Sequence, residues 1–297
     1  MIEALRTPDD RFADLPGYAF TPHYAAIDGL RMHYVDAGGR DGPVFLCLHG
    51  QPSWSYLYRK MIPVFVGAGR VIAPDLFGFG RSDKPVDDEI YTFDFHRASL
   101  LALIDALDLN DITLVCQDWG GILGLTLPMD RPNRFKRLIV MNTVLGTGDR
   151  SLGQGFEMWR AFNRSQPDLD VGALMLRATP ILSSAEAAAY SAPYPDIRFK
   201  AGVRRFPELV PDSPEAGGAE TSRRAARWWS EEWRGASFMA IGAQDPVLTP
   251  AMMEELRKTI RCCPEAMVIS DAGHFVQEWG KPIARAALAE FARPAAA

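Results

Sequence analysis

The first 146 residues alternate between short apolar runs and longer stretches with helical spacing. The runs that we interpret as strands cover residues 24–27, 30–36, 43–48, 70–75, 112–117 and 138–141. The stretches with helical period lie at residues 54–66, 93–107 and 120–129. Because repeated strand–helix units connect by right-handed crossovers, this pattern predicts an α/β fold with a mostly parallel sheet flanked by helices.

The alternation stops at residue 147 and resumes after residue 234. The intervening segment is helical in pattern, rich in Ala and Arg, and interrupted only by prolines. Strands are predicted again at residues 237–242 and 266–269, and helices at residues 252–260 and 282–291. We therefore divide the chain into a first part of the core (1–146), a helical cap (147–234) and a second part of the core (235–297).

The composition is that of an ordinary soluble domain, with 47% hydrophobic and 23% charged residues in 297. A net charge of -5 argues against a nucleic-acid partner. No apolar run is long enough to cross a membrane, and residues 1–10 lack the apolar centre of a signal peptide, so we expect a cytoplasmic protein. Cys47 and Cys116 lie in strand runs and should be buried, while Cys262 and Cys263 have no metal-ligand spacing nearby. We expect no disulfide and no metal.

The segment 111–121 predicts a buried strand, a tight glycine turn and the start of a helix. This is the layout of a nucleophile elbow, which lifts one side chain above the end of a strand. The lifted residue is Asp118. A carboxylate that attacks an ester or amide forms a high-energy anhydride, whereas attack on a saturated carbon with a leaving group forms an ordinary ester that water can cleave. The elbow therefore favours alkyl substrates over peptides and lipids.

Two further side chains beyond predicted strands could complete a catalytic triad with Asp118. The order Asp118, Asp245, His274 along the chain is the order nucleophile, acid, histidine of the α/β hydrolases. All three would project from the same edge of the sheet. An acid could also follow an earlier strand, but Asn142 occupies that position and cannot ionise. Asp271 is a second candidate acid because it is close to His274 in sequence.

The loop after the first long buried strand supplies a main-chain N–H to the oxyanion hole in this fold. The predicted donors are the N–H groups of Gln51 and Trp119, which would stabilise the tetrahedral intermediate of ester hydrolysis. The Trp119 indole is also a donor without an acceptor, which suits a leaving halide. A second indole should come from the cap, where the candidates are Trp159, Trp228, Trp229 and Trp233. We favour the first, because the other three share an Arg-rich stretch typical of packing between cap and core.

With these features, the chain resembles the haloalkane dehalogenases of the α/β-hydrolase superfamily, in the branch typified by a dichloroethane dehalogenase. The resemblance covers nearly the whole length. Its motifs are residues 49–58 (HGQPSWSYLY), 117–121 (QDWGG), 206–207 (FP) and 271–278 (DAGHFVQE). The motif at 117–121 is only moderately specific, since epoxide hydrolases carry close relatives of it.

The resemblance implies a role for each motif residue. Asp118 is expected to be the nucleophile, His274 the general base, Asp245 its orienting acid, and Trp119 and Trp159 the halide-binding indoles. The substrate pocket is expected to be lined by Phe156, Phe206, Pro207, Val210, Ile122, Val247 and Leu248. A small haloalkane and a halide ion are the expected partners, no cofactor is expected, and the chain should be a monomer.

The sequence departs from the branch at three positions. Gln51 stands where the branch typically has glutamate, which changes the local charge but not the main-chain donor. Ile122 stands where the best-known relative has an aromatic residue, which predicts a differently shaped pocket. Cys116 replaces the first glycine of the usual elbow.

Other functions remain open from the sequence alone. An epoxide hydrolase would share nucleophile, base and acid and would need acidic phenols from the cap, where Tyr190 and Tyr194 lie. A fluoroacetate-type dehalogenase would want arginine after the nucleophile, where Trp119 stands. A non-catalytic receptor on this fold would usually lose one member of the triad, and all three are present.

Overall fold

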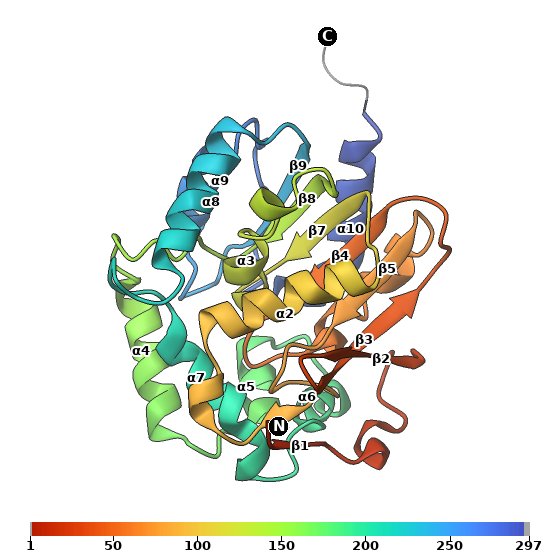
Figure 1. Ribbon diagram of the computed structural model, residues 1–297, viewed down its shortest axis with the longest axis vertical. Helices are drawn as coiled ribbons and strands as arrows, with labels where there is room; N and C mark the ends of the chain where they lie inside the picture. Colours follow the sequence, from red (N-terminus) through yellow and green to blue (C-terminus); the bar gives the residue numbers. More distant parts are fainter. Residues whose placement is uncertain (1, 294–297) are drawn as a thin grey trace.

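The computed structural model describes residues 2–293, and a sheet of eight strands forms its centre (Figure 1). From one edge to the other, the strands are β10 (Met267–Ile269), β9 (Ala236–Gly242), β8 (Phe135–Met141), β7 (Ile112–Cys116), β4 (Val44–Leu48), β5 (Arg70–Pro74), β3 (Leu30–Ala37) and β2 (Pro22–Ile27). All neighbours from β10 to β5 are parallel, while β3 and β2 join antiparallel. The predicted mostly parallel sheet is confirmed.

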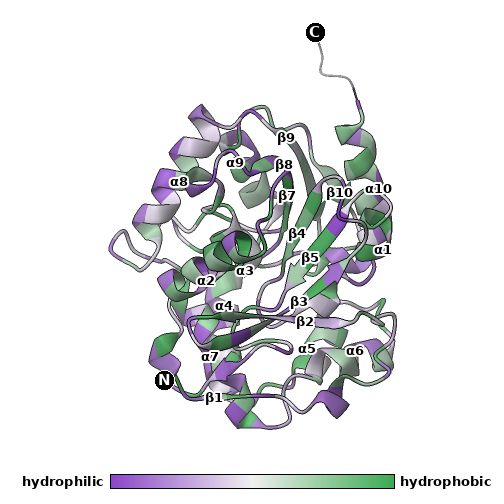
Figure 2. Ribbon diagram, turned by 45° about the vertical axis from the view of Figure 1, so that its right-hand side comes forward, coloured by the Kyte–Doolittle hydropathy of each residue, from purple (hydrophilic) through white to green (hydrophobic). Residues whose placement is uncertain are grey.

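Helices cover both faces of this sheet. Figure 2 shows α2 (Phe93–Ala106) and α3 (Trp119–Gly124) on one side and α1 (Ile62–Phe65) and α10 (Gly280–Phe291) on the other. Every residue of β4 and β7 is buried as a result. A parallel strand covered on both faces needs apolar side chains at successive positions, which explains why these strands read as continuous apolar runs.

Helix α2 shows how the local sequence sets an element. The Thr92 side chain accepts a hydrogen bond from the Phe95 N–H at 3.1 Å and caps the first turn. Its buried side chains, which include His96, Leu100 and Leu103, recur every three or four residues and therefore share the face that meets the sheet.

Five helices lie between β8 and β9, and within the described chain no strand interrupts them. They are α4 (Gly153–Ser165), α5 (Val171–Ala178), α6 (Ser184–Ser191), α7 (Ala201–Leu209) and α8 (Ala219–Glu231). Figure 1 shows α4 to α7 gathered at one end of the sheet, while α8 runs back along the core toward α9 (Pro250–Thr259). The helical character of residues 147–234 is as predicted, and the division of the chain into core and cap at 146 and 234 remains a prediction.

The helix predicted over residues 54–66 is wrong in detail. The structure has a 3₁₀ turn at Ser55–Tyr58 and a short α1 that starts at Ile62. Pro63 explains the break, because it cannot donate a hydrogen bond to the carbonyl of Arg59 and its ring crowds that carbonyl. A proline is accommodated best in the first turn of a helix, which is where α1 places it.

The helix predicted over residues 120–129 is also shorter than expected. Helix α3 ends at Gly124, and a separate 3₁₀ turn covers Pro128–Asp130. The carbonyl of Leu125 accepts a hydrogen bond from the Trp229 indole at 2.7 Å instead of continuing the helix. The pattern also missed a small antiparallel sheet of β1 (Ala4–Leu5) and β6 (Lys84–Pro85), because two residues carry no periodicity.

Two further expectations concern burial and length. Cys47 and Cys116 are fully buried, as predicted. Across residues 2–293, no helix combines the length and the apolar character that crossing a bilayer requires.

Candidate active site

Asp118 occupies a strained turn between β7 and α3. Its backbone has φ 50° and ψ -128°, a conformation that residues other than glycine rarely adopt. The turn is tight because the chain behind it touches β4: a Cβ on Gly120 would lie 1.9 Å from the carbonyl oxygen of Leu48. A glycine is therefore required there, and the packing holds the Asp118 side chain above the carboxyl end of the sheet.

The three residues of the predicted triad lie together. His274 Nδ1 is 2.8 Å from Asp245 Oδ2, and His274 Nε2 is 3.5 Å from Asp118 Oδ2. They come from the ends of β10, β9 and β7, three strands that are close in the order of the sheet. The structure thus joins, at one edge, side chains that are up to 156 positions apart in sequence.

The predicted acid has a fully buried side chain with several donors. The Oδ1 atom of Asp245 accepts from the N–H groups of Val247 at 2.8 Å and Leu248 at 3.0 Å. Burial would raise the pKa of Asp245, but His274 and these N–H groups outweigh it and lower the pKa. The competing acid, Asp271, is exposed and accepts from the Trp279 indole at 3.1 Å, so it does not serve the histidine.

The carboxylates around His274 determine its charge preference. Burial would lower the pKa of the imidazole, but the charges of Asp245 and Asp118 outweigh burial and shift the pKa upward. Because these groups favour the imidazolium form, a role as general base requires either loss of one negative charge or a hydrogen bond that favours the neutral ring.

The loop predicted to form the oxyanion hole contacts the predicted nucleophile directly. The Gln51 N–H donates to Asp118 Oδ1 at 2.7 Å. The loop lies so close that a Cβ on Gly50 would be 2.0 Å from the same oxygen. His49 fixes the loop, because its Nε2 accepts from the Leu76 N–H at 2.9 Å while its Nδ1 lies 2.9 Å from the Gly50 carbonyl.

The side chain of Gln51 turns away from the charge and binds the cap. Its Nε2 donates to the carbonyl of Val203 in α7 at 2.8 Å, and Asn163 in α4 donates to the same carbonyl at 3.2 Å. A glutamate at position 51 could not donate this bond, so the departure from the family pattern ties the oxyanion loop to α7.

The predicted halide-binding indoles differ in position. Trp119 is the first residue of α3, so its main-chain N–H has no partner within the helix. Its buried indole ring packs edge-on against Phe206 with ring centroids 4.8 Å apart. Trp159 is half-buried in α4, beside Phe162. Among the described residues, neither indole N–H has a protein acceptor, which leaves both available to a ligand.

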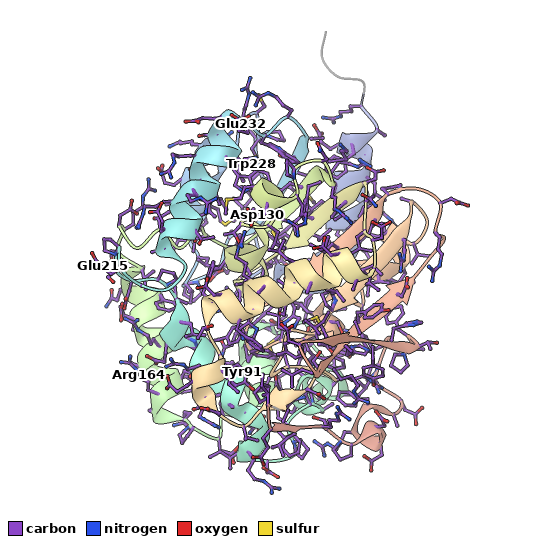
Figure 3. The ribbon with its side chains drawn as sticks, viewed as in Figure 1. Tyr91, Asp130, Arg164, Glu215, Trp228 and Glu232 are labelled. Atoms are coloured by element: carbon purple, nitrogen blue, oxygen red, sulfur yellow. The ribbon has the colours of Figure 1, made fainter. Side chains whose placement is uncertain are left out.

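The other candidate indoles are placed elsewhere. Trp229 donates to Leu125, and Trp233 donates to Ser237 Oγ at 2.9 Å. Trp228 lines a hollow of about 710 Å³ beside Phe135 and Gly235, where β8 and β9 begin. Figure 3 shows Trp228 toward the opposite end of the molecule from Tyr91. Because the triad lies where these strands end, Trp228 is not placed to meet a ligand at Asp118.

The predicted pocket residues are buried except Val247, which is half-buried. They are Phe156 in α4, Phe206, Pro207 and Val210 at α7, Ile122 in α3, and Val247 and Leu248 in the loop after Asp245. Helix α4 presses on that loop, since a Cβ on Gly155 would lie 1.8 Å from the Pro246 carbonyl oxygen. Phe156 is thereby held beside the loop that carries the acid.

A row of aromatic side chains packs against Phe206. Its ring packs edge-on against Phe79 and His96, with centroids 4.7 and 4.6 Å away. Tyr91 is labelled in Figure 3 near the start of α2 and beside α7, and its ring centroid lies 5.8 Å from that of His96. Its hydroxyl donates to the Pro85 carbonyl at 2.8 Å. This stacking fixes the ring that faces the Trp119 indole.

The sequence missed two amides at the site. Gln117 Nε2 lies 2.9 Å from His274 Nε2, and Asn142 Nδ2 lies 2.9 Å from Asp245 Oδ2. The sequence did contain one indication, since both are polar residues that directly follow apolar strands. Polar side chains at the carboxyl edge of such a sheet are typical of a ligand site.

The fold and this site define an α/β hydrolase with an aspartate at the turn after β7, and a model of the alpha/beta hydrolase fold matches residues 43–281. The curated relatives narrow this class. A haloalkane dehalogenase of Psychrobacter cryohalolentis is 45% identical over 288 residues, which are 93% of this chain and 94% of that protein. Haloalkane dehalogenase 1 of Mycobacterium tuberculosis is 42% identical over 285 residues, again 93% and 94%. The chain belongs to the haloalkane dehalogenases, hydrolases that act on carbon–halide bonds.

Solved structures agree with this assignment. A haloalkane dehalogenase of Paraglaciecola agarilytica NO2, described as tetrameric, has a TM-score of 0.96 and 51% identity, over 99% of this chain and 100% of that one. A more distant member, DbeA of Bradyrhizobium elkani USDA94, has a TM-score of 0.75 and 27% identity, over 91% and 98%. The resemblance seen in the sequence is confirmed.

Proposed function

We propose that the chain cleaves the carbon–halogen bond of haloalkanes through a covalent ester on Asp118. The observation that carries this assignment is the environment of its carboxylate: Oδ1 accepts from Gln51 N–H at 2.7 Å, and Oδ2 faces His274 Nε2 at 3.5 Å. Oδ2 attacks the carbon that bears the halogen, from the side opposite the halogen. The carbon–halogen bond breaks, and its electron pair leaves on the halide.

The departing halide is stabilised by the indoles of Trp119 and Trp159. Each indole hydrogen bond to a charged acceptor contributes about 1.5–3 kcal/mol. The apolar residues around the site exclude water, which weakens hydration of the carboxylate and strengthens the indole donors. They are Phe156, Phe206, Pro207, Val210, Ile122, Val247 and Leu248.

Hydrolysis of the ester follows. Ester formation removes the negative charge of Asp118, which is one of the two charges that raise the pKa of His274. The ring is therefore neutral more readily at the stage where it must act as a base. His274 takes a proton from water while Asp245 holds the ring, and the hydroxide adds to the carbonyl carbon of Asp118. The N–H groups of Gln51 and Trp119 stabilise the oxyanion. Collapse of the intermediate breaks the ester, the alkoxide takes up a proton, and the second proton passes to solvent.

Trapping of the ester tests the proposal. The His274→Phe variant should form the ester but not cleave it, so mass spectrometry after exposure to 1,2-dibromoethane should find a bromoethyl adduct on the peptide that contains Asp118. The Asp118→Asn, His274→Phe double variant is the matched control and should carry no adduct. Full turnover by His274→Phe would overturn the mechanism, and absence of bromide release by the unmodified protein would indicate a non-catalytic binder.

An epoxide hydrolase is less well supported. It would need free phenols, but the Tyr190 hydroxyl donates to Glu278 and the Tyr194 hydroxyl donates to the Pro52 carbonyl at 3.2 Å. Burial raises the pKa of both phenols well above the usual value, which makes them poor acids. Diol formation from styrene oxide at a rate comparable to bromide release would restore this alternative.

The assembly and location are also proposals. The relative from Paraglaciecola agarilytica is described as tetrameric, which does not fit the monomer expected from the sequence. We infer that this chain also assembles, and light scattering during size-exclusion chromatography should give a multiple of the chain mass. A cytoplasmic location remains a prediction.

A further inference from the structure

Gln117 is a fully buried amide between the nucleophile and the histidine, and the proposed mechanism does not yet use it. It directly follows β7 and precedes Asp118. Its Nε2 lies 2.9 Å from His274 Nε2 and donates to the main-chain carbonyl of His274 at 3.1 Å. Its Oε1 accepts from the side chain of Gln277 at 3.3 Å. All polar atoms of the Gln117 side chain are therefore engaged.

These contacts fix the orientation of the amide. A carbonyl oxygen can only accept, so the atom of Gln117 that faces the His274 carbonyl must be the nitrogen. The same nitrogen faces His274 Nε2, which must then accept a hydrogen bond. A ring that accepts at Nε2 carries its proton on Nδ1, where Asp245 Oδ2 receives it at 2.8 Å. Gln117 and Asp245 together specify the neutral ring and its tautomer.

The charged groups around His274 act in the opposite direction. Asp245, from the loop after β9, and Asp118, from the turn after β7, are the titratable residues that face the ring within the described chain. Both favour the imidazolium, which is why they raise the pKa of His274. Phe275 packs against the ring with centroids 4.9 Å apart, and among residues 2–293 the charged groups that shift the pKa of His274 are these two carboxylates.

The state of this ring matters for the first half-reaction. An imidazolium at Nε2 would form a short charge-assisted hydrogen bond to Asp118, of about 2.7–2.9 Å, and would withdraw electron density from the attacking oxygen. The observed separation of 3.5 Å is longer than such a bond. The Gln117 nitrogen, at 2.9 Å, is the nearer partner of Nε2.

We propose that Gln117 is a positioning residue that holds His274 neutral before the substrate reacts, and thereby keeps the Asp118 carboxylate free to attack. The inference rests on the proposed function, in which Asp118 is the nucleophile and His274 the base. When water enters for the second half-reaction, it replaces one amide hydrogen at Nε2, and the bond to the His274 carbonyl keeps the amide in place.

The pH dependence of the alkylation step tests this role. If a neutral His274 is needed, single-turnover bromide release from 1,2-dibromoethane should fall at acid pH with the pKa of this ring. Gln117→Met removes the donor at similar size and should move this acid limb up by about one pH unit, a tenfold loss at fixed acid pH. Gln117→Glu replaces the donor with an acceptor and should move it further. Gln166→Met, which removes an exposed amide at the end of α4 outside this network, should leave the limb in place.

A second background separates this inference from the mechanism. His274→Phe tests the mechanism through the adduct on Asp118, and in that background Gln117→Met should no longer change the alkylation rate or its pH dependence. An equal effect of Gln117→Met with and without His274 would show a merely structural role and overturn the inference. Nitrogen-15 NMR of the wild-type histidines needs no variant: His274 should be neutral and protonated on Nδ1 at pH 7, and an imidazolium signal would also overturn it.

Discussion

Asn142 donates its side-chain amide to Asp245 Oδ2 at 2.9 Å, the same oxygen that lies 2.8 Å from His274 Nδ1. The carbonyl oxygen of that amide accepts from the Gly242 N–H at 2.8 Å, which prevents the amide from turning over. A residue that cannot ionise thus occupies the alternative position for the acid and donates to the proposed acid, Asp245. The contact helps to keep a fully buried carboxylate charged.

Replacement of Asn142 by leucine should slow turnover by about tenfold. The variant loses one hydrogen bond to a charged group, worth about 1.5 kcal/mol, and Asp245 then orients and polarises His274 less effectively. Because the second half-reaction of the proposed mechanism depends on His274, alkylated enzyme should accumulate, which rapid-quench mass spectrometry can measure. Asn110→Leu, on an exposed loop, is the control and should behave as wild type. Wild-type turnover in Asn142→Leu would contradict this role.

Replacement of Trp159 by phenylalanine should weaken halide binding by tenfold or more. The ring keeps its packing against Phe162, but the indole donor is lost, and a hydrogen bond to an anion contributes about 1.5–3 kcal/mol. Quenching of tryptophan fluorescence by bromide measures the affinity. The matched control is Trp228→Phe, at the other end of the strands, which should leave the affinity unchanged. If the two variants bind bromide equally well, the second donor lies elsewhere.

Loss of the Glu278 charge should destabilise the fold by about 3–5 kcal/mol. Arg59, with 2% of its side chain exposed, contacts Glu278 through two nitrogens at 2.6 and 2.9 Å and reaches Glu186 of α6 at 2.7 Å. In Glu278→Gln, a buried guanidinium loses its main counter-charge. Urea unfolding measures the change, and Glu290→Gln, which breaks an exposed pair with Arg293, should cost at most about 1 kcal/mol. Similar losses in both variants would refute the assignment.

Replacement of His96 by phenylalanine should make stability less dependent on pH. Burial lowers the pKa of His96 to about 3, and neither ring nitrogen has a hydrogen-bond partner among residues 2–293. Between about 6.5 and 3 the unfolded chain binds a proton that the folded chain excludes, so this residue contributes stability above pH 6.5 that is lost as pH falls toward 3.

The His96→Phe variant removes this loss and an unsatisfied buried polar ring, and Phe206, Phe95 and Tyr91 surround the new side chain with aromatic contacts. Thermal unfolding at pH 7 and pH 5 measures the slope. Asn110→Gln, which changes an exposed side chain that does not titrate, is the control and should retain the wild-type slope. An unchanged slope in His96→Phe would contradict the assignment.

The strands of the central sheet were predictable because buried strands require apolar side chains, which are visible in the sequence. The strands β4 and β7 are covered on both faces and therefore consist of consecutive apolar residues. The predicted bounds of the helices were wrong where a single residue or a distant contact, and not the periodic pattern, sets the helix end. Pro63 delays α1, and the Trp229 indole, 104 positions away from Leu125, takes a carbonyl at the end of α3.

The site divides in the same way. Asp118, Asp245 and His274 could be predicted because each follows a strand and their order along the chain is characteristic. The contacts of Gln117 and Asn142 could not be predicted, because they depend on which strands become neighbours and on the rotation of an amide. A polar residue at the end of an apolar strand predicts that something is bound there, but it does not identify the partner.

The side chain of Gln51 links the loop after β4 to helix α7, so the two should move together. The residue that donates its N–H to Asp118 also donates its side-chain amide to the Val203 carbonyl, so any displacement of α7 relative to the core loads the contact at Asp118 as well. Transfer of α7 and its neighbours onto a relative with glutamate at the position of Gln51 would set a carboxylate against the Val203 carbonyl. Chimeras should therefore carry the loop and the cap together.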